Sequence, residues 1–405
     1  MEVHEDCGVR LLFIDVRAEH LNPTATLLPR MFASLPHAVD FWGPGYTEDA
    51  TLRGGLRRWV DIHGPYDAIV AGTAIPLLAE DVEAGVAAAA SALFRNAVQG
   101  SGVKSLETCF RDVLGAFDLL PVRHRIVTTL NFDCYAATSK QIDRIQRGDW
   151  MLLGPDDAFT SRLADLPDYA RRELHYAKKA ARLSDAWLEM LQGRRHRHLA
   201  ALHFVAPEEI CFQPLQKRAQ RIAVPGVAYV LRREAIDALR SSGVSNPGLI
   251  IPRLIRSAAK LGIPVFRWRR GLDAYHRAFQ RTLRRTQVVY TARGGFGLPV
   301  RKFFEIPAAG AVMACTPCLG MQHIGFQPGK HYVDLAPDDL PTWLASARNH
   351  DEMQALADAG RALVAQSHSL QARAEQVSRC LDRLESGDFA GSRWRNGQFE
   401  LMERH

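Results

Sequence analysis

Long hydrophobic runs are missing from this sequence of 405 residues. No window approaches the roughly 18 apolar residues of a transmembrane helix, and the stretch 84–93, which is rich in small residues, is too short. The acidic segment Met1–Asp6 lacks the basic start and the cleavage site of a secretory signal peptide. We therefore expect a cytoplasmic protein whose association with a membrane is at most peripheral.

Cysteine is scarce as well, with seven residues spread over the chain. An odd number of scattered cysteines favours reduced thiols over a disulfide framework. Cys315 and Cys318 form a single C-x-x-C pair, and a structural zinc ion would need two further ligands, of which only His323 lies nearby in the sequence. We expect no bound metal ion and no resident cofactor.

Neither sign of charge dominates, because the formal net charge is only +7. The densest arginine runs lie at 194–198, 267–270 and 281–285. Two interpretations stay open: a solvated face, or a surface that attracts an anion such as a diphosphate or an acidic membrane. No aromatic-rich nucleic-acid motif accompanies these arginines, so we expect no nucleic-acid partner.

The sequence does contain two successive alternations of strand and helix signals. Apolar runs typical of buried parallel strands occur at 9–16, 38–42, 66–71, 125–130 and 150–153, and a second series follows at 222–231, 265–268, 287–290, 311–316 and 331–335. This order predicts the α/β class, with two facing, Rossmann-like, doubly wound parallel-sheet domains at 1–215 and 216–349. A helical segment, 350–405, could pack back on the first domain. Ligands of such sheets bind beyond the carboxyl ends of the strands, here in a cleft between the domains.

The segment best suited to chemistry is 290–310, where a strand is followed by a glycine-rich loop and a short helix. Glycines let backbone amides approach an anion closely, and Arg301 and Lys302 favour an anion at the start of the helix. Glu305 can accept hydrogen bonds from a ribose diol. An ordinary turn and an amphipathic helix that ends at Gly310 explain the same pattern without a ligand. The loop glycines are Gly294, Gly295 and Gly297.

The stretch 301–312 (RKFFEIPAAGAV) resembles the signature of CgeB-like bacterial glycosyltransferases, a branch of the group-1 glycosyltransferases with the GT-B fold. The similarity continues through 224–229 and 326–330 and through His368-Ser369 with Arg373, and it is weaker before residue 220. The resemblance implies a glycosyltransferase that moves a sugar from a nucleotide-sugar donor to a hydroxyl group. The acceptor would be a protein, a polysaccharide or an envelope precursor.

The resemblance also implies roles for the matching residues. Glu305 would bind the donor ribose, and Arg301 would lie near the diphosphate and act in catalysis; neither side chain is expected to fill a core. Group-1 enzymes usually have another glutamate eight positions earlier, where this chain has Gly297, so the stereochemical outcome and the activity itself stay open. The full predicted donor side comprises Gly294, Gly295, Gly297, Arg301, Lys302, Glu305, Pro307 and Gly310.

No D-x-D triplet occurs in the sequence. Metal-dependent transferases use such carboxylates to hold a divalent ion on the diphosphate. Without them, arginine, lysine and helix dipoles must stabilise the departing nucleoside diphosphate. We therefore expect a metal-independent reaction.

The first half of the chain offers weaker candidates. Asp133 follows a predicted strand and could be the general base for an acceptor hydroxyl, or an ordinary capping aspartate. Asn22 and Thr24 follow the first strand and could line the acceptor side, or simply begin a helix. His203 is expected to be structural. Two alternatives to a transferase stay open: a nucleotide-sugar epimerase, for which we see no acid–base cluster, and a degenerate sugar-nucleotide-binding or scaffold protein.

Overall fold

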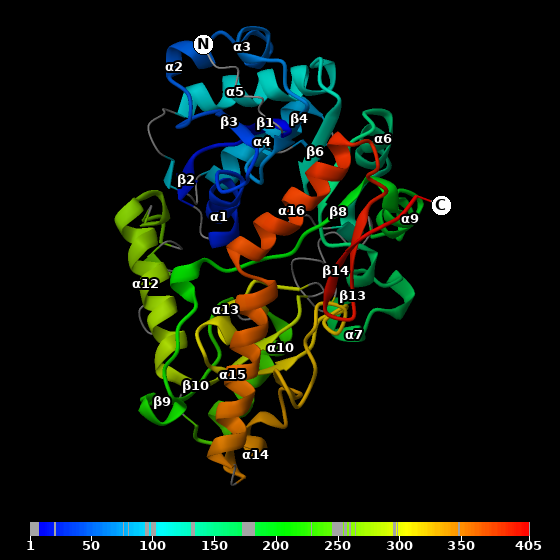
Figure 1. Cartoon of the computed structure of the whole chain (residues 1–405). Coiled ribbons are helices and arrows are strands. Elements are labelled where there is room, and N and C mark those ends of the chain that lie inside the picture. The colour runs from blue at the N-terminus through cyan, green and yellow to red at the C-terminus, as the bar shows by residue number, and fades with distance from the viewer. Residues whose placement is uncertain are drawn as a thin grey trace, which may run out of the picture.

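The computed structural model places two parallel sheets one after the other along the chain (Figure 1). It describes residues 8–19, 22–75, 77–79, 81–93, 97–98, 103–130, 134–171, 183–227, 229–244, 254, 257–258, 261–263, 265–294, 297, 299–346 and 349–404. The α/β class with two Rossmann-like domains, predicted from the sequence, is confirmed.

The first sheet has six strands, and every neighbouring pair is parallel. Its order is β3 (Ala38–Trp42), β1 (Arg10–Ile14), β4 (Ala68–Ala71), β6 (His124–Thr128), β7 (Met151–Gly154) and β8 (His198–Ala200). The helices of this half are α1 (Pro23–Phe32), α2 (Asp49–Leu52), α3 (Leu56–His63), α4 (Val82–Leu93), α5 (Val103–Ala116), α6 (Ser139–Arg147), α7 (Asp168–Arg171) and α9 (Ala186–Gly193). A short antiparallel pair joins β2 (Ala18–Glu19) to β5 (Ala97–Val98).

The apolar run at the start of the chain explains why β1 lies inside this sheet. Alternate residues of a strand point to opposite faces. Leu12 and Ile14 accordingly join the core beneath α3, α5 and α6, whereas Leu11 and Phe13 join the core beneath α1. Both faces of the strand are covered, so an uninterrupted hydrophobic sequence is required.

The second sheet has four parallel strands in the order β12 (Val333–Asp334), β11 (Val312–Thr316), β10 (Thr286–Ala292) and β9 (Gln220–Ala223). Its helices are α10 (Val230–Ser241), α12 (Arg269–Arg285), α13 (Lys302–Ala308) and α14 (Leu340–Ala345). Two strand predictions need correction. Residues 265–267 form a turn of 3-10 helix that leads into α12, and the strand predicted at 222–231 ends at Ala223, before α10.

The C-terminal helices divide between the two domains (Figure 1). α15 (His350–Ser367) packs on α13 and β11, whereas α16 (Leu370–Glu385) packs on α1 and contributes Leu381 to the first domain's core. Where the chain crosses back, the amide of Val205 donates to the carbonyl of His368 (3.1 Å), and the amide of Leu370 donates to the carbonyl of Val205 (2.8 Å). The hairpin β13 (Ser392–Arg395) and β14 (Gln398–Leu401) ends the fold.

Among the helices that the structure describes, none combines the length and the apolar composition needed to span a membrane.

Candidate active site

The turn after β9 brings two cations to the carboxyl edge of the second sheet. Gly226 has a φ of +98°, a backbone conformation that residues other than glycine rarely adopt. A Cβ at this position would lie 2.8 Å from Nζ of Lys302 and 2.9 Å from Nη1 of Arg232. The turn therefore packs its bare backbone against a lysine and an arginine. Arg232 is itself buried, with its guanidinium 4.9 Å from the centre of the Tyr229 ring.

The glycine-rich loop follows β10 at the same edge. The amide of Gly297 donates to the carbonyl of Gly294 (2.9 Å), and the amide of Leu319 donates to the carbonyl of Gly297 (2.8 Å). Gly297 has a φ of +80°, and a Cβ there would lie 2.8 Å from Cγ of Leu319. A glutamate would thus be strained, by both backbone and space, at the position where the group-1 enzymes usually carry one. Gly295 lies outside the described residues.

Arg301 is held between two carboxylates instead of facing an open cleft. Its Nη2 lies 2.5 Å from Oε2 of Glu209, and its Nη1 pairs with Oε1 of Glu305. All three side chains are buried, and Arg301 is 6% exposed. Burial alone would lower the pKa of Arg301, but the carboxylates of Glu305 and Glu209 outweigh it and raise that pKa. The expectation that Arg301 and Glu305 stay out of a core is therefore wrong.

Glu209 ties this cluster to the segment that links the domains. Its Oε2 also accepts from the amide of Ala206 (2.7 Å), and its Oε1 accepts from Nε2 of Gln280 on α12 (2.9 Å). No pattern in the sequence indicated that Glu209 pairs with Arg301. The Arg301–Glu305 pair did carry a signal, because residues four apart on a helix are neighbours.

Pro307 and Gly310 lie away from the carboxyl edge, which argues against their predicted contact with the donor. Pro307 is buried in α13, and its Cβ would be 3.3 Å from a Cβ added at Gly360 of α15. Gly310, with a φ of +67°, turns the chain into the amino end of β11 beside Arg218. Helix packing and helix termination account for both residues.

Thr24, one of the two residues predicted on the acceptor side, contacts a histidine of its own domain. Oγ1 of Thr24 lies 3.0 Å from Nδ1 of His203, which follows β8. Burial, together with the positive charges of Arg301, Arg373 and Lys302, lowers the pKa of His203 to about 3. His203 is therefore neutral near pH 7. Asn22 caps α1 by accepting from the amide of Thr24 (3.1 Å).

His368, Ser369 and Arg373, which carry part of the family resemblance, lie buried where the two domains meet. Nε2 of His368 donates to the carbonyl of Ile324 (2.9 Å), which leaves Nδ1 to accept from Nη2 of Arg373 (3.4 Å). Ser369 caps α16 by accepting from the amide of Ala372 (3.2 Å). Burial lowers the pKa of His368 to about 3 and that of Arg373 to about 9. These residues hold in place the segment where the chain crosses back from the second domain to the first.

A buried carboxyl that the sequence analysis missed stands directly after β1. Oδ1 of Asp15 accepts from the amides of Val16 (2.9 Å) and Ala74 (3.1 Å), while Oδ2 has no hydrogen-bond partner among the described residues. Burial raises the pKa of Asp15 to about 7, although backbone amides lower it in part. Its position directly after an apolar strand was the feature of the sequence that could have identified it. Asp133, the predicted general base, lies outside the described residues.

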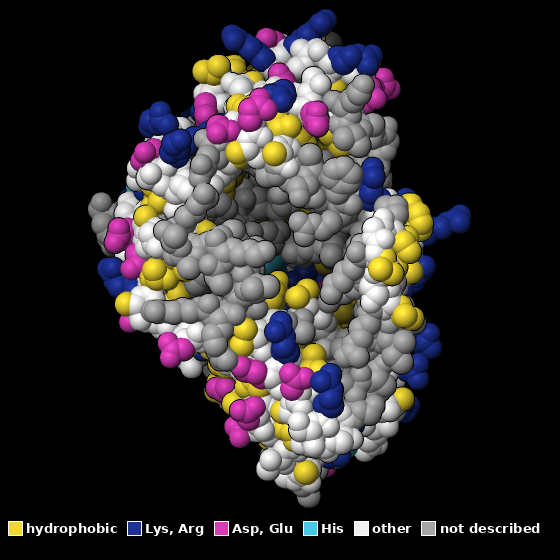
Figure 2. Space-filling view, turned by 180° about the vertical axis from the view of Figure 1, so that it is seen from behind, with side chains coloured by type: hydrophobic (Ala, Val, Ile, Leu, Met, Phe, Trp, Pro, Cys, Tyr) yellow, Lys and Arg dark blue, Asp and Glu magenta, His cyan; other side chains and the backbone are white. Residues whose placement is uncertain are grey.

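The face seen in Figure 2 is hollowed between the two domains. Within the described ranges, no group of three or more His, Cys, Asp or Glu side chains is arranged to hold a metal ion. These residues place cations at the edge of the second sheet, and a neutral histidine, a threonine hydroxyl and a carboxyl near the edge of the first.

Part of the second half of the chain is similar to a known protein family. Residues 232–379 match the family described as "Glycosyl transferase-like". The matched segment spans α10 to α16 and contains Lys302, Glu305 and Arg373. This part of the chain is thus similar to that family. No curated protein matches the sequence.

Solved structures of low sequence identity cover most of the chain. HepE from Anabaena in complex with UDP-glucose is 11% identical, with a TM-score of 0.49, over 93% of this chain and 100% of that chain. A glycosyltransferase from Rickettsia africae is 8% identical, with a TM-score of 0.42, over 93% and 98%. Sucrose-phosphate synthase from Thermosynechococcus elongatus is 10% identical, with a TM-score of 0.41, over 94% and 100%.

Proposed function

We propose that this protein, with its glycosyl transferase-like domain at 232–379, is a metal-independent glycosyltransferase that moves a sugar from a nucleotide-sugar donor to a hydroxyl acceptor. The observation that carries the proposal is the pair of cations, Lys302 and Arg232, packed against the bare turn at Gly226. They stand at the carboxyl edge of a parallel sheet, where ligands of this architecture bind. The signature at 301–312 further favours the CgeB-like branch.

We propose that Lys302 and Arg232, rather than Arg301, bind the diphosphate. A leaving nucleoside diphosphate needs cations that are already in place when its charge develops. Arg301 is neutralised by two carboxylates, so its part is to fix α13 and thereby the position of Lys302, the next residue. Glu305 shares that role.

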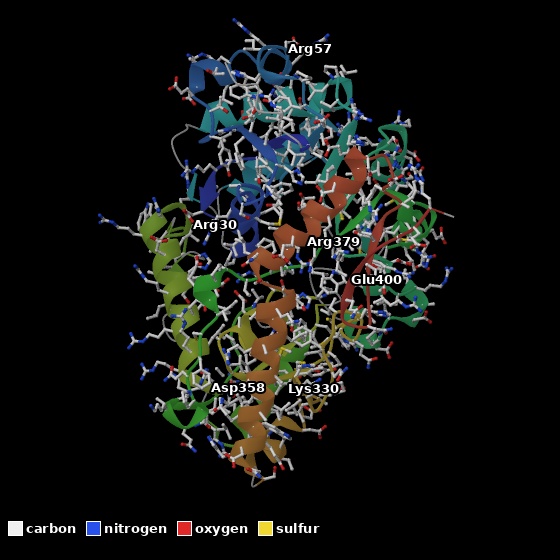
Figure 3. All side chains as sticks on the ribbon, in the orientation of Figure 1. Arg30, Arg57, Lys330, Asp358, Arg379 and Glu400 are labelled. Atoms are coloured by element: carbon white, nitrogen blue, oxygen red, sulfur yellow. The ribbon has the colours of Figure 1, made fainter. Side chains whose placement is uncertain are left out.

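The first test is donor binding to a Lys302→Ala variant. Loss of a charge-assisted contact of about 1.5–3 kcal/mol should weaken binding of UDP roughly ten- to a hundredfold. UDP is the probe because solved HepE holds UDP and UDP-glucose. Lys330→Ala removes an exposed lysine elsewhere on the second domain (Figure 3) and should leave the affinity unchanged in the same calorimetric titration. Equal affinities of the two variants would place the donor elsewhere.

Independence of metal gives a second expected result. Since lysine and arginine supply the positive charge, treatment with EDTA should leave UDP binding and sugar transfer nearly unchanged. Transfer is followed by product analysis with and without added manganese or magnesium. A strict requirement for either ion would overturn this account of the leaving group.

Product analysis also separates the proposed transferase from its alternatives. A new glycosidic bond identifies a transferase, whereas a donor epimer identifies an epimerase. Binding of the donor with neither product identifies a sugar-nucleotide-binding protein, an outcome made plausible by the conformation of Gly297, which leaves no place for the usual glutamate. Asp133 stays our proposed base for the acceptor hydroxyl, with Thr24 on the acceptor side.

A further inference from the structure

A second cavity lies where the first domain meets the first turn of α12. It has a volume of about 370 Å³, and none of the donor-edge residues Gly226, Lys302 or Arg232 lines it. The segment after β1, helix α1, the end of β3 and helix α12 all contribute to its wall. Figure 3 shows Arg30 on the side of the first domain that faces α12. The charged and aromatic residues of the lining are Arg17, Glu19, Arg30, Phe41, Tyr46 and Arg269.

Positive charge exceeds negative charge in this lining. Nη1 of Arg30 pairs with Oε1 of Glu208 (2.5 Å), and Nε of Arg269 lies 4.0 Å from Oε1 of Glu19. The Arg30–Glu208 pair lies in solvent and the Arg269–Glu19 contact is long, so an incoming anion can compete with these carboxylates. Arg17 is exposed, and the described residues offer its guanidinium neither an ion pair nor a hydrogen bond. One arginine is thus directly available to a ligand, and two more can turn towards it.

An aromatic surface lies beside these arginines. The rings of Phe41 and Tyr46 stack with centroids 5.3 Å apart. Burial and the carboxyl of Asp15 raise the pKa of the Tyr46 hydroxyl, although Arg17 lowers it. The hydroxyl therefore stays protonated and can donate a hydrogen bond. Apolar faces with a few convergent polar groups are typical of small-ligand sites.

We propose that this cavity binds the negatively charged group, a phosphate or a carboxylate, of an acidic sugar acceptor. The inference rests on the transferase function proposed above and names its acceptor class. Arg269 and Phe279 are ten positions apart on α12, which is about 15 Å of helix. The Phe279 ring lies 5.7 Å from Nζ of Lys302. An acceptor anchored at Arg17 and Arg269 can therefore extend along α12 towards the donor edge.

Calorimetric titration with three probes tests this proposal. Glucose 6-phosphate and glucuronate should bind the protein saturated with UDP, and glucose should bind at least tenfold more weakly. Arg17→Ala should weaken both acidic sugars about tenfold or more, as expected for the loss of a charge-assisted contact, and leave UDP binding unchanged. Arg57→Ala, which removes an exposed arginine of α3 at the far end of the first domain (Figure 3), should change neither affinity.

Three outcomes would overturn the proposal: unchanged binding of the acidic sugars to Arg17→Ala, equal affinity for glucose, or displacement of the acidic sugars by UDP. Displacement would mean that the anion occupies the donor edge. Failure of the protein to bind UDP counts against the transferase function alone. In that case the acidic sugars are titrated without UDP, with Lys302→Ala as the control for the donor edge.

Discussion

Replacement of Arg301 by methionine is expected to lower the free energy of unfolding by about 3–5 kcal/mol. Arg301 is the shared cation of Glu209 and Glu305, and all three side chains are buried. Methionine fills similar space without charge, so two carboxylates stay buried with no partner of opposite sign. An uncompensated buried charge costs far more than the ion pair itself contributed. Urea denaturation followed by circular dichroism at pH 8 measures the difference.

Two further variants show whether the loss of stability comes from the unpaired carboxylates. Adding Glu209→Gln and Glu305→Gln to Arg301→Met removes the buried charges, so most of the lost stability should return. Arg393→Met breaks an exposed pair with Glu400 (3.1 Å) and should cost less than about 1 kcal/mol. If Arg301→Met unfolds at the same urea concentration as the wild type, the buried cluster is wrong and Arg301 is available to the donor.

The architecture could be predicted because its signals are local. Leu11–Ile14 reads as a strand covered on both faces, and the structure buries it on both faces. The prediction of a strand at 265–268 was wrong because the apolar run is short. Three of its four residues, Val265, Phe266 and Trp268, are apolar, as in a short strand, but the chain there turns directly into α12. Four residues are too few to separate a strand from a helical turn by period alone.

The site was harder to predict because its contacts are distant in the sequence. Glu209 is 92 residues from Arg301, and no local pattern joins an acidic residue of the linker to the start of α13. Arg301 therefore resembled an unpaired cation suited to a diphosphate. Only the fold shows that its charge is already neutralised and that Lys302, one residue later, reaches the turn at Gly226.

Asp15 was missed for a related reason. The sequence shows an aspartate after a strand, but its burial depends on two glycines from later loops. A Cβ at Gly72 would overlap the carboxyl of Asp15, and Gly43 packs against its backbone carbonyl. These close approaches exclude water from Oδ2, so the charged form loses solvation.

Asp15→Asn is expected to change how stability depends on pH. The pKa of Asp15 is raised from 3.8 to about 7, so between these values the folded state keeps a proton that the unfolded state has lost. The contribution of Asp15 to stability must therefore fall as the pH rises across this range, by at most about 4 kcal/mol. Asparagine cannot ionise, and it keeps an oxygen to accept from the amides of Val16 and Ala74.

The clearest measure is the stability of Asp15→Asn relative to the wild type at pH 8 compared with that at pH 4. An unpartnered amide group costs about 1–3 kcal/mol at either pH, so it cancels in this comparison. The relative stability of the variant should rise by up to about 4 kcal/mol between pH 4 and pH 8, and the variant should be the more stable protein at pH 8.

The buried histidines His203 and His368 also make stability depend on pH, but they are common to both proteins and cancel as well. Asp143→Asn, at an exposed position of α6, should show no such change. A relative stability of Asp15→Asn that does not vary with pH would mean that Asp15 is ionised in the folded protein and that water or a cation reaches Oδ2.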